Sequence, residues 1–194
     1  MATIAYKRKY HINQAIGATS VNESYMISDP ESGCGLAAVD EKSGIGTVIG
    51  KAFLDKTLLP VKLEMVSSEG TKILEMYQPI AIIKPSFTVK SSDGRLLCIL
   101  KSNSCFLKPF IEVLDEREQV IGSITGNWRF NDFKFNDVSG KEIATIKHCY
   151  GGFLRETLTT ADDYDIEMLA ETPDTSLAMV TLASAIAIDI WYHE

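Results

Sequence analysis

Histidine and cysteine are scarce in this chain of 194 residues, and basic residues are missing from its last part. The three histidines lie far apart, at 11, 148 and 193, and none belongs to a nucleophile elbow or a helical metal-binding pair. The sequence also has no glycine loop of the phosphate-cradling kind. We therefore predict a protein that is not an enzyme, and we assign no catalytic residue.

The four cysteines, at 34, 98, 105 and 149, do not form the close pairs of structural zinc sites. A domain of this size needs no disulfide, so we expect free and mostly buried thiols. His148 and Cys149 are neighbours, but adjacent residues of a strand point to opposite faces, which disfavours a thiolate–imidazole pair.

Basic residues are absent after Arg155, whereas nine acids occur there. The first 155 residues hold all 19 basic residues and are nearly neutral, while the whole chain carries a net charge of −7. This charge argues against nucleic-acid binding, which needs clustered Lys and Arg. The nine acids are Glu156, Asp162, Asp163, Asp165, Glu167, Glu171, Asp174, Asp189 and Glu194.

A secretory signal is not found either, because Lys7, Arg8 and Lys9 follow the first residues with no apolar run behind them. We expect a cytoplasmic protein, with peripheral membrane association as an addition. The three basic residues are the candidate lipid contacts, since each contributes about 1 kcal/mol near an anionic leaflet. A frayed N-terminal arm is the alternative.

One long uncharged run is present, from Thr175 to Ile188, and as a helix it is apolar on every side. It would span roughly 21 Å at about 1.5 Å per residue, whereas a bilayer-spanning helix needs about 20 apolar residues. The run therefore predicts a buried core helix over about 175–190, with a membrane span as the alternative. The residues that we expect to be structural are Leu177, Val180, Ile186, Asp189 and Trp191.

Strand–turn–strand patterns fill the middle of the chain, as in FTVKSSDGRLLCILK and FKFNDVSGKEIATIKH. The turn glycines Gly70, Gly94 and Gly140 lie 24 and then 46 residues apart, with Glu118 near the missing step of this repeat. Together with SYMISDPESGCGLAAVDEK upstream, these patterns predict about ten to twelve strands. A barrel of that size is too wide for its own side chains to fill, so we place the apolar helix inside it.

Several segments resemble the phospholipid scramblases. LRETLTTADDYDIEM, from Leu154, is similar to their stretch in which leucine-arginine-glutamate leads into an acidic run, and AIAIDIWYHE is similar to their closing helix. SYMISDPESG, SSEGTKILEMYQP and VIGSITGNW resemble their tyrosine-containing first strand, their glycine turn before a proline and their glycine-then-tryptophan strand.

The resemblance extends from about Ser24 to the end and implies a Tubby C-terminal-like fold, shared with LURP-one-related proteins. This fold is mainly β, a closed antiparallel β-barrel of about 12 strands around a buried hydrophobic C-terminal α-helix. We accordingly expect one scramblase-like barrel domain over 24–194, with 1–23 as an N-terminal arm or first strand.

The resemblance also implies that Ca²⁺, the one candidate cofactor, binds the acidic segment 160–171. The candidate ligands are Asp162, Asp163, Asp165, Glu167 and Glu171. A calcium loop has an acid at its first position and glycine at its sixth, but here these positions are Thr160 and Asp165. The alternative is a strand, because Tyr164, Ile166 and Met168 alternate with acids in the pattern of a strand buried on one face.

Two functions are left open by the sequence. The first is a scramblase-like protein that binds phospholipids or a membrane surface, with calcium-dependent transbilayer lipid movement as its fuller form. The alternative is a soluble protein-interaction or regulatory module with an unknown protein partner and no lipid transport.

Trp128, at a strand end beside Arg129 and Phe130, is expected to be a core aromatic rather than part of a ligand-contacting patch.

Overall fold

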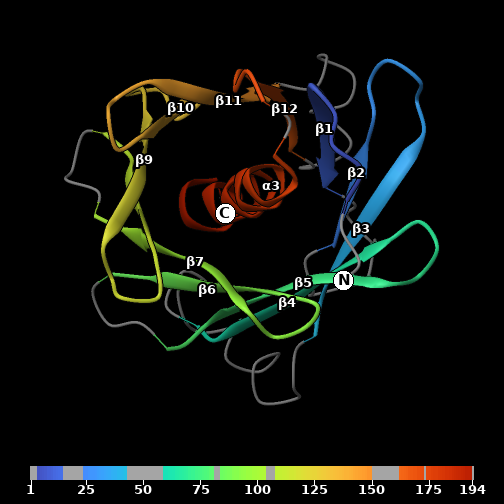
Figure 1. The fold of residues 1–194 in the computed structure, drawn as a ribbon, viewed down its shortest axis with the longest axis horizontal. Helices are drawn as coiled ribbons and strands as arrows, with labels where there is room; N and C mark the ends of the chain where they lie inside the picture. The colour runs from blue at the N-terminus through green and yellow to red at the C-terminus, as the bar shows by residue number, and fades with distance from the viewer. Residues whose placement is uncertain are drawn as a thin grey trace.

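The computed structural model describes residues 4–14, 24–42, 59–80, 84–103, 108–149, 162–172 and 174–193. Within these ranges, twelve strands form one closed antiparallel barrel around one helix, which confirms the predicted fold class (Figure 1). The elements are β1 (Lys9–Gln14), β2 (Ser24–Ser28), β3 (Gly35–Glu41), β4 (Val61–Ser67), β5 (Lys72–Gln78), β6 (Ser86–Ser91), β7 (Leu96–Ser102), β8 (Phe110–Leu114), β9 (Val120–Gly126), β10 (Asp132–Asp137), β11 (Glu142–Cys149), β12 (Asp163–Met168) and α3 (Thr175–Tyr192).

The strands follow one another around the ring in chain order, and β1 closes it by pairing with β12. In this pair Tyr10 lies opposite Ile166 and Ile12 lies opposite Tyr164. Successive strands run in opposite directions, so their connections fall alternately at the two ends of the barrel.

The tight-turn end of the barrel comprises the turns 29–34, 68–71, 92–95, 115–119 and 138–141. Four of the five turns place a glycine at positive φ, where a side chain would be strained. In the fifth, Glu118 takes this conformation at φ 57°. The repeat inferred from the turn glycines is therefore confirmed, including the step at Glu118.

The helix-exit end is opposite, and its described residues are 42, 59–60, 79–80, 84–85, 103, 108–109, 127–131 and 162. The C-terminal end of α3 lies here, because Tyr192 packs on Phe130 with ring centroids 5.8 Å apart. Phe130 belongs to the turn between β9 and β10, which has no glycine and holds this residue at φ 59°.

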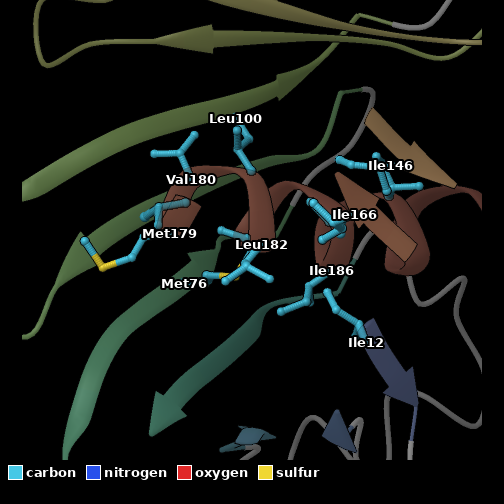
Figure 2. Packing of buried hydrophobic residues seen from close by; sticks show 14 of the residues in the cluster. Ile12, Met76, Leu100, Ile146, Ile166, Met179, Val180, Leu182 and Ile186 are labelled. Carbon is cyan, nitrogen blue, oxygen red and sulfur yellow. The ribbon is translucent and has the colours of Figure 1, made fainter. Parts of the chain in front are cut away.

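The helix α3 fills the barrel, and every residue from Ala178 to Trp191 is buried. Four alanines in this stretch keep it slim, and its hydroxyls are satisfied locally: Thr181 and Ser184 donate to backbone carbonyls one turn earlier, at 2.8 and 2.7 Å. Figure 2 shows Met179, Leu182 and Ile186 among strand side chains. The surrounding strand residues labelled there are Ile12, Met76, Leu100, Ile146 and Ile166.

Length and composition alone would let α3 cross a membrane, but 78% of it is buried inside the protein. The strands supply the apolar surroundings that a helix without a solvent face needs. Of the residues expected to be structural, Val180, Ile186, Asp189 and Trp191 are buried, and Leu177 is partly buried against the core.

The described cysteines are free, as predicted, but they differ in burial. Cys98 lies in the core, where burial raises the pKa of its thiol to about 12. Cys34 is exposed in a turn at the tight-turn end, so the expectation of mostly buried thiols is wrong for this residue. Cys149 is intermediate, and Cys105 lies outside the described residues.

Candidate functional site

Asp189 is fully buried near the C-terminal end of α3 and is held by side chains from three strands. Tyr25 of β2 and Tyr164 of β12 donate their hydroxyls to its two carboxylate oxygens, each at 2.7 Å. Gln14 of β1 adds a longer amide contact of 3.4 Å. Burying a carboxylate is costly unless donors replace water, so these contacts fix α3 in its barrel.

Two further side chains fasten this end of α3. The indole N–H of Trp191 donates to the side-chain oxygen Oε1 of Gln78 at 2.7 Å, and the ring of Trp191 stacks on that of Phe87 with centroids 5.4 Å apart. The Tyr192 hydroxyl lies 3.1 Å from that of Ser102 on β7. The end of α3 is therefore attached to strands on several sides of the ring.

Beside this network, a cluster of two histidines and one aspartate lies at the helix-exit end. His148 Nε2 at the end of β11 is 2.7 Å from Asp162 Oδ1, which precedes β12. The ring of His193, the C-cap residue of α3, stacks on His148 with centroids 4.4 Å apart. His193 Nε2 also lies 2.7 Å from the Phe130 carbonyl oxygen. Burial, and then the nearby His148, lowers the pKa of His193.

Sequence spacing did not reveal this cluster, because His148 and His193 belong to different elements. The fold brings them together because β11 runs toward the helix-exit end and α3 ends there. The topology of the predicted barrel could have revealed the cluster. In a series of antiparallel hairpins, every second strand finishes on the side of the barrel where the helix also finishes.

Trp128 lies on the surface of the same end, in the turn 127–131. Its side chain is 68% exposed, and the Arg129 guanidinium lies over its ring at 4.8 Å. The expectation of a core aromatic is therefore wrong: the strand ends at Gly126, and Trp128 lies at the tip of the turn beyond it. Ile80, 72% exposed, is a second large apolar residue of this end.

The two ends differ in charge. Among the described residues outside the strands, the helix-exit end has four bases, all exposed, and one acid, Asp162, which contacts His148. The five turns of the tight-turn end have seven acids and three bases. The four bases are Lys42, Lys84, Lys108 and Arg129. The seven acids are Asp29, Glu31, Glu69, Asp93, Asp115, Glu116 and Glu118, and the three bases are Arg95, Arg117 and Lys141.

The fold and the C-terminal segments direct attention to one family. Residues 112–194 match the family model Scramblase. The scramblase resemblance is thus confirmed from within β8 to the end, a part that includes Trp128, the histidine cluster and α3. No curated protein matches this chain. No solved structure matches it either.

The acidic segment of the scramblase resemblance forms β12, as the strand alternative predicted. Tyr164, Ile166 and Met168 are buried, while Asp165 and Glu167 are exposed. Asp163 is also largely buried, and its carboxylate accepts a hydrogen bond from the Asn13 amide.

The remaining acids of the segment have separate partners. Asp165 accepts from His11 at 2.8 Å and from Cys149 at 3.1 Å; burial opposes ionisation, but these contacts outweigh it and lower the pKa of Asp165. Glu171 pairs with Lys141 at 2.9 Å. Within the described ranges, the one group of three ligand-type side chains with close atoms is His148, Asp162 and His193. The calcium site stays a prediction.

The N-terminal lipid-contact candidates lie beside the tight-turn end. Lys7 forms an ion pair of 2.9 Å with Asp29, whereas Arg8 and Lys9 are exposed. Lys9, the first residue of β1, lies opposite Glu167 of β12. Their role in lipid contact also stays a prediction.

Proposed function

We propose that this scramblase-like protein acts without catalysis as a peripheral membrane protein, and that it binds anionic phospholipid surfaces through the helix-exit end. The observation that carries the proposal is the exposed Trp128 with Arg129 stacked over its ring. Tryptophan favours the membrane interface because its ring is apolar and its N–H is polar. A guanidinium beside it is suited to a lipid phosphate.

The charge of this end supports the same orientation. Among the residues that the structure describes outside the strands at this end, four exposed bases are present and the one acid, Asp162, contacts His148. Each basic residue near an anionic surface contributes about 1 kcal/mol. The acidic turns of the opposite end would be repelled by the same surface, so the membrane would orient the protein.

The proposal keeps α3 inside the barrel. Withdrawing it into lipid would break the contacts of Asp189 with Tyr25 and Tyr164 and would expose the apolar lining of twelve strands. Membrane contact through surface residues needs neither change. Transbilayer lipid movement is therefore not part of the proposed function.

Vesicle flotation tests the proposal. The full chain is mixed with phosphatidylcholine vesicles with or without phosphatidylserine, each with and without Ca²⁺. We expect retention on the anionic vesicles, and a loss of about tenfold in affinity for Trp128→Ala, since burying a large apolar side chain contributes at least about 1.5 kcal/mol. Arg129→Ala should weaken binding less, by about fivefold.

The opposite end supplies matched controls. Val138→Ala removes an apolar side chain that is 73% exposed, and Arg117→Ala removes a base, both from tight turns. Neither should change flotation. Loss of binding in Arg8→Ala or Lys9→Ala, with Trp128→Ala unaffected, would move the contact to the other end and contradict the proposal. No retention on any vesicle, together with a stable protein partner, would favour the interaction module.

A further inference from the structure

Three side chains from distant parts of the chain converge at the helix-exit end. His148 is the penultimate residue of β11, Asp162 precedes β12, and His193 caps α3. Each offers one ligand atom, and these atoms all lie within 4.8 Å of one another. His148 is buried, and the other two side chains are partly buried.

We infer that His148, Asp162 and His193 form a binding site for a divalent transition metal ion of the zinc type. Zinc binds imidazole nitrogen and carboxylate oxygen at about 2.0–2.2 Å, so ligand atoms around one ion lie within roughly 4 Å of each other. The three ligand atoms, which lie within 4.8 Å of one another, need to move only slightly closer together to reach this spacing. Two histidines and a carboxylate leave the fourth tetrahedral position to water.

The donor set distinguishes this site from the predicted calcium site. Calcium takes six to eight oxygen ligands, and the five candidates of the acidic segment are all carboxylates. Here two of the three donors are imidazoles, which suit zinc, copper, nickel and cobalt. Asp162 is the one residue common to both sets.

The surroundings orient the ligands. In the tautomer that donates Nε2–H to the Phe130 carbonyl, His193 has its lone pair on Nδ1. A metal-binding histidine usually donates its second ring N–H to a carboxylate, a backbone carbonyl or water, and the Phe130 carbonyl fits this pattern. Phe130 also packs on Tyr192, so the turn 127–131 and the end of α3 hold the His193 ring together.

Metal binding at this place would join the end of α3 to β11 and to the start of β12. Because the three ligands converge only in the folded chain, the ion binds the native state and stabilises it. The ion would thus act as a clamp on the one helix that the structure describes inside the barrel.

A second cluster of metal-ligand residue types provides a control. On the outer face of the barrel, His11 and Cys149 both contact Asp165, at 2.8 and 3.1 Å. His11→Ala removes one imidazole there, just as His193→Ala removes one from the proposed site. The two substitutions therefore separate a specific site from binding to any surface histidine.

The test uses the untagged full chain and isothermal titration with Zn²⁺ alone, with Co²⁺ as a spectroscopic probe and Ca²⁺ as a competitor. We expect one Zn²⁺ per chain, a rise in Tm on zinc addition and visible Co²⁺ bands. His193→Ala and Asp162→Asn should each weaken zinc binding at least about tenfold and remove the Tm rise. His11→Ala should keep both, and Ca²⁺ should not compete.

Circular dichroism verifies that each variant is folded, and Asp162→Asn keeps a hydrogen-bonding group if His193→Ala unfolds. Absence of zinc binding by the wild-type chain would overturn the inference. So would loss of binding in His11→Ala with His193→Ala and Asp162→Asn unchanged. Vesicle binding is not part of the readout, so the metal site and the proposed membrane function stand or fail separately.

Discussion

The two ends of the barrel are built from different kinds of connection. At the tight-turn end, short turns repeat one design: Asp115 and Asp137 each accept two backbone N–H groups of their own turn through Oδ1, at 2.8 to 3.0 Å. At the helix-exit end, contacts join residues far apart in sequence, such as Tyr25 with Asp189. One end sets the strand register locally, and the other fixes the helix and carries the candidate site.

The same contrast is found along α3 itself. Asp174 at its start is an exposed N-cap that accepts from the backbone N–H of Ser176 and Leu177, at 2.8 and 3.2 Å. Asp189 near its end is fully buried and accepts from side chains. The two aspartates should therefore contribute differently to stability, because losing a hydrogen bond costs more free energy where the unpaired group is buried.

Removing the element that connects the two ends should have the largest effect. A chain lacking residues 176–194 loses the apolar filling of the barrel, whose burial is comparable with the whole stability of about 5–15 kcal/mol. We expect no cooperative thermal transition by circular dichroism. A truncated chain that stays folded and soluble would show that the barrel does not depend on α3.

Substitution at the two aspartates of α3 sharpens the comparison of its ends. Asp189→Ala leaves the Tyr25 and Tyr164 hydroxyls without their acceptor in the core and should cost about 2–5 kcal/mol. Asp174→Ala, the matched control, removes one cap and should cost about 1 kcal/mol. Urea unfolding measures both free energies, and equal costs would contradict the contrast.

A smaller effect is expected within the tight-turn end. Glu118 has a left-handed backbone conformation, which is strained for a residue with a side chain. Glu118→Gly removes this strain and should stabilise the protein by about 1 kcal/mol, even after the greater freedom of glycine in the unfolded chain is subtracted. Gly140→Ala, at φ 84°, should destabilise it by a similar amount. Changes of opposite sign in the free energy of urea unfolding would support the shared turn design. Changes of the same sign in both variants would argue against it.

The smallest expected effect is a change in stability at low pH. The ion pair with Lys7, followed by hydrogen bonds from the backbone of Glu31 and from Ser32, lowers the pKa of Asp29 to about 2. Since the unfolded pKa is about 3.9, the stabilisation is present above about pH 4 and is lost as the pH falls toward 2. The difference in unfolding free energy between wild type and Asp29→Asn should shrink over this range. A pH-independent difference would rule out the ion pair as its source.

Most of the fold could be predicted from the sequence because its signals are local. The Ser-Asp-Gly turns and the alternation in Phe133, Lys134 and Phe135 define hairpins without knowledge of the rest. A helix that is apolar on every side has to be buried, and a barrel made of these hairpins can surround it. The turn at Glu118 could also be placed, because the repeat predicted it even without a glycine.

The candidate site could be predicted only in part, because its contacts depend on which side chains meet across the barrel. The sequence predicts a structural role for Asp189, but the two tyrosines that bind it come from β2 and β12. His148 and His193 meet only after the ring has closed around α3. Trp128 was assigned to the core from residue type alone, although its position beyond the strand places it in solvent.

Closure of the barrel also limits how partners can bind. Each of the twelve described strands has a hydrogen-bonded neighbour on both sides, including β1 and β12. Open sheets recruit peptides, and also aggregate, through the free N–H and C=O groups of an edge strand. These strands offer no such edge, so recognition by them has to use side chains, and the domain gains protection against strand-to-strand association.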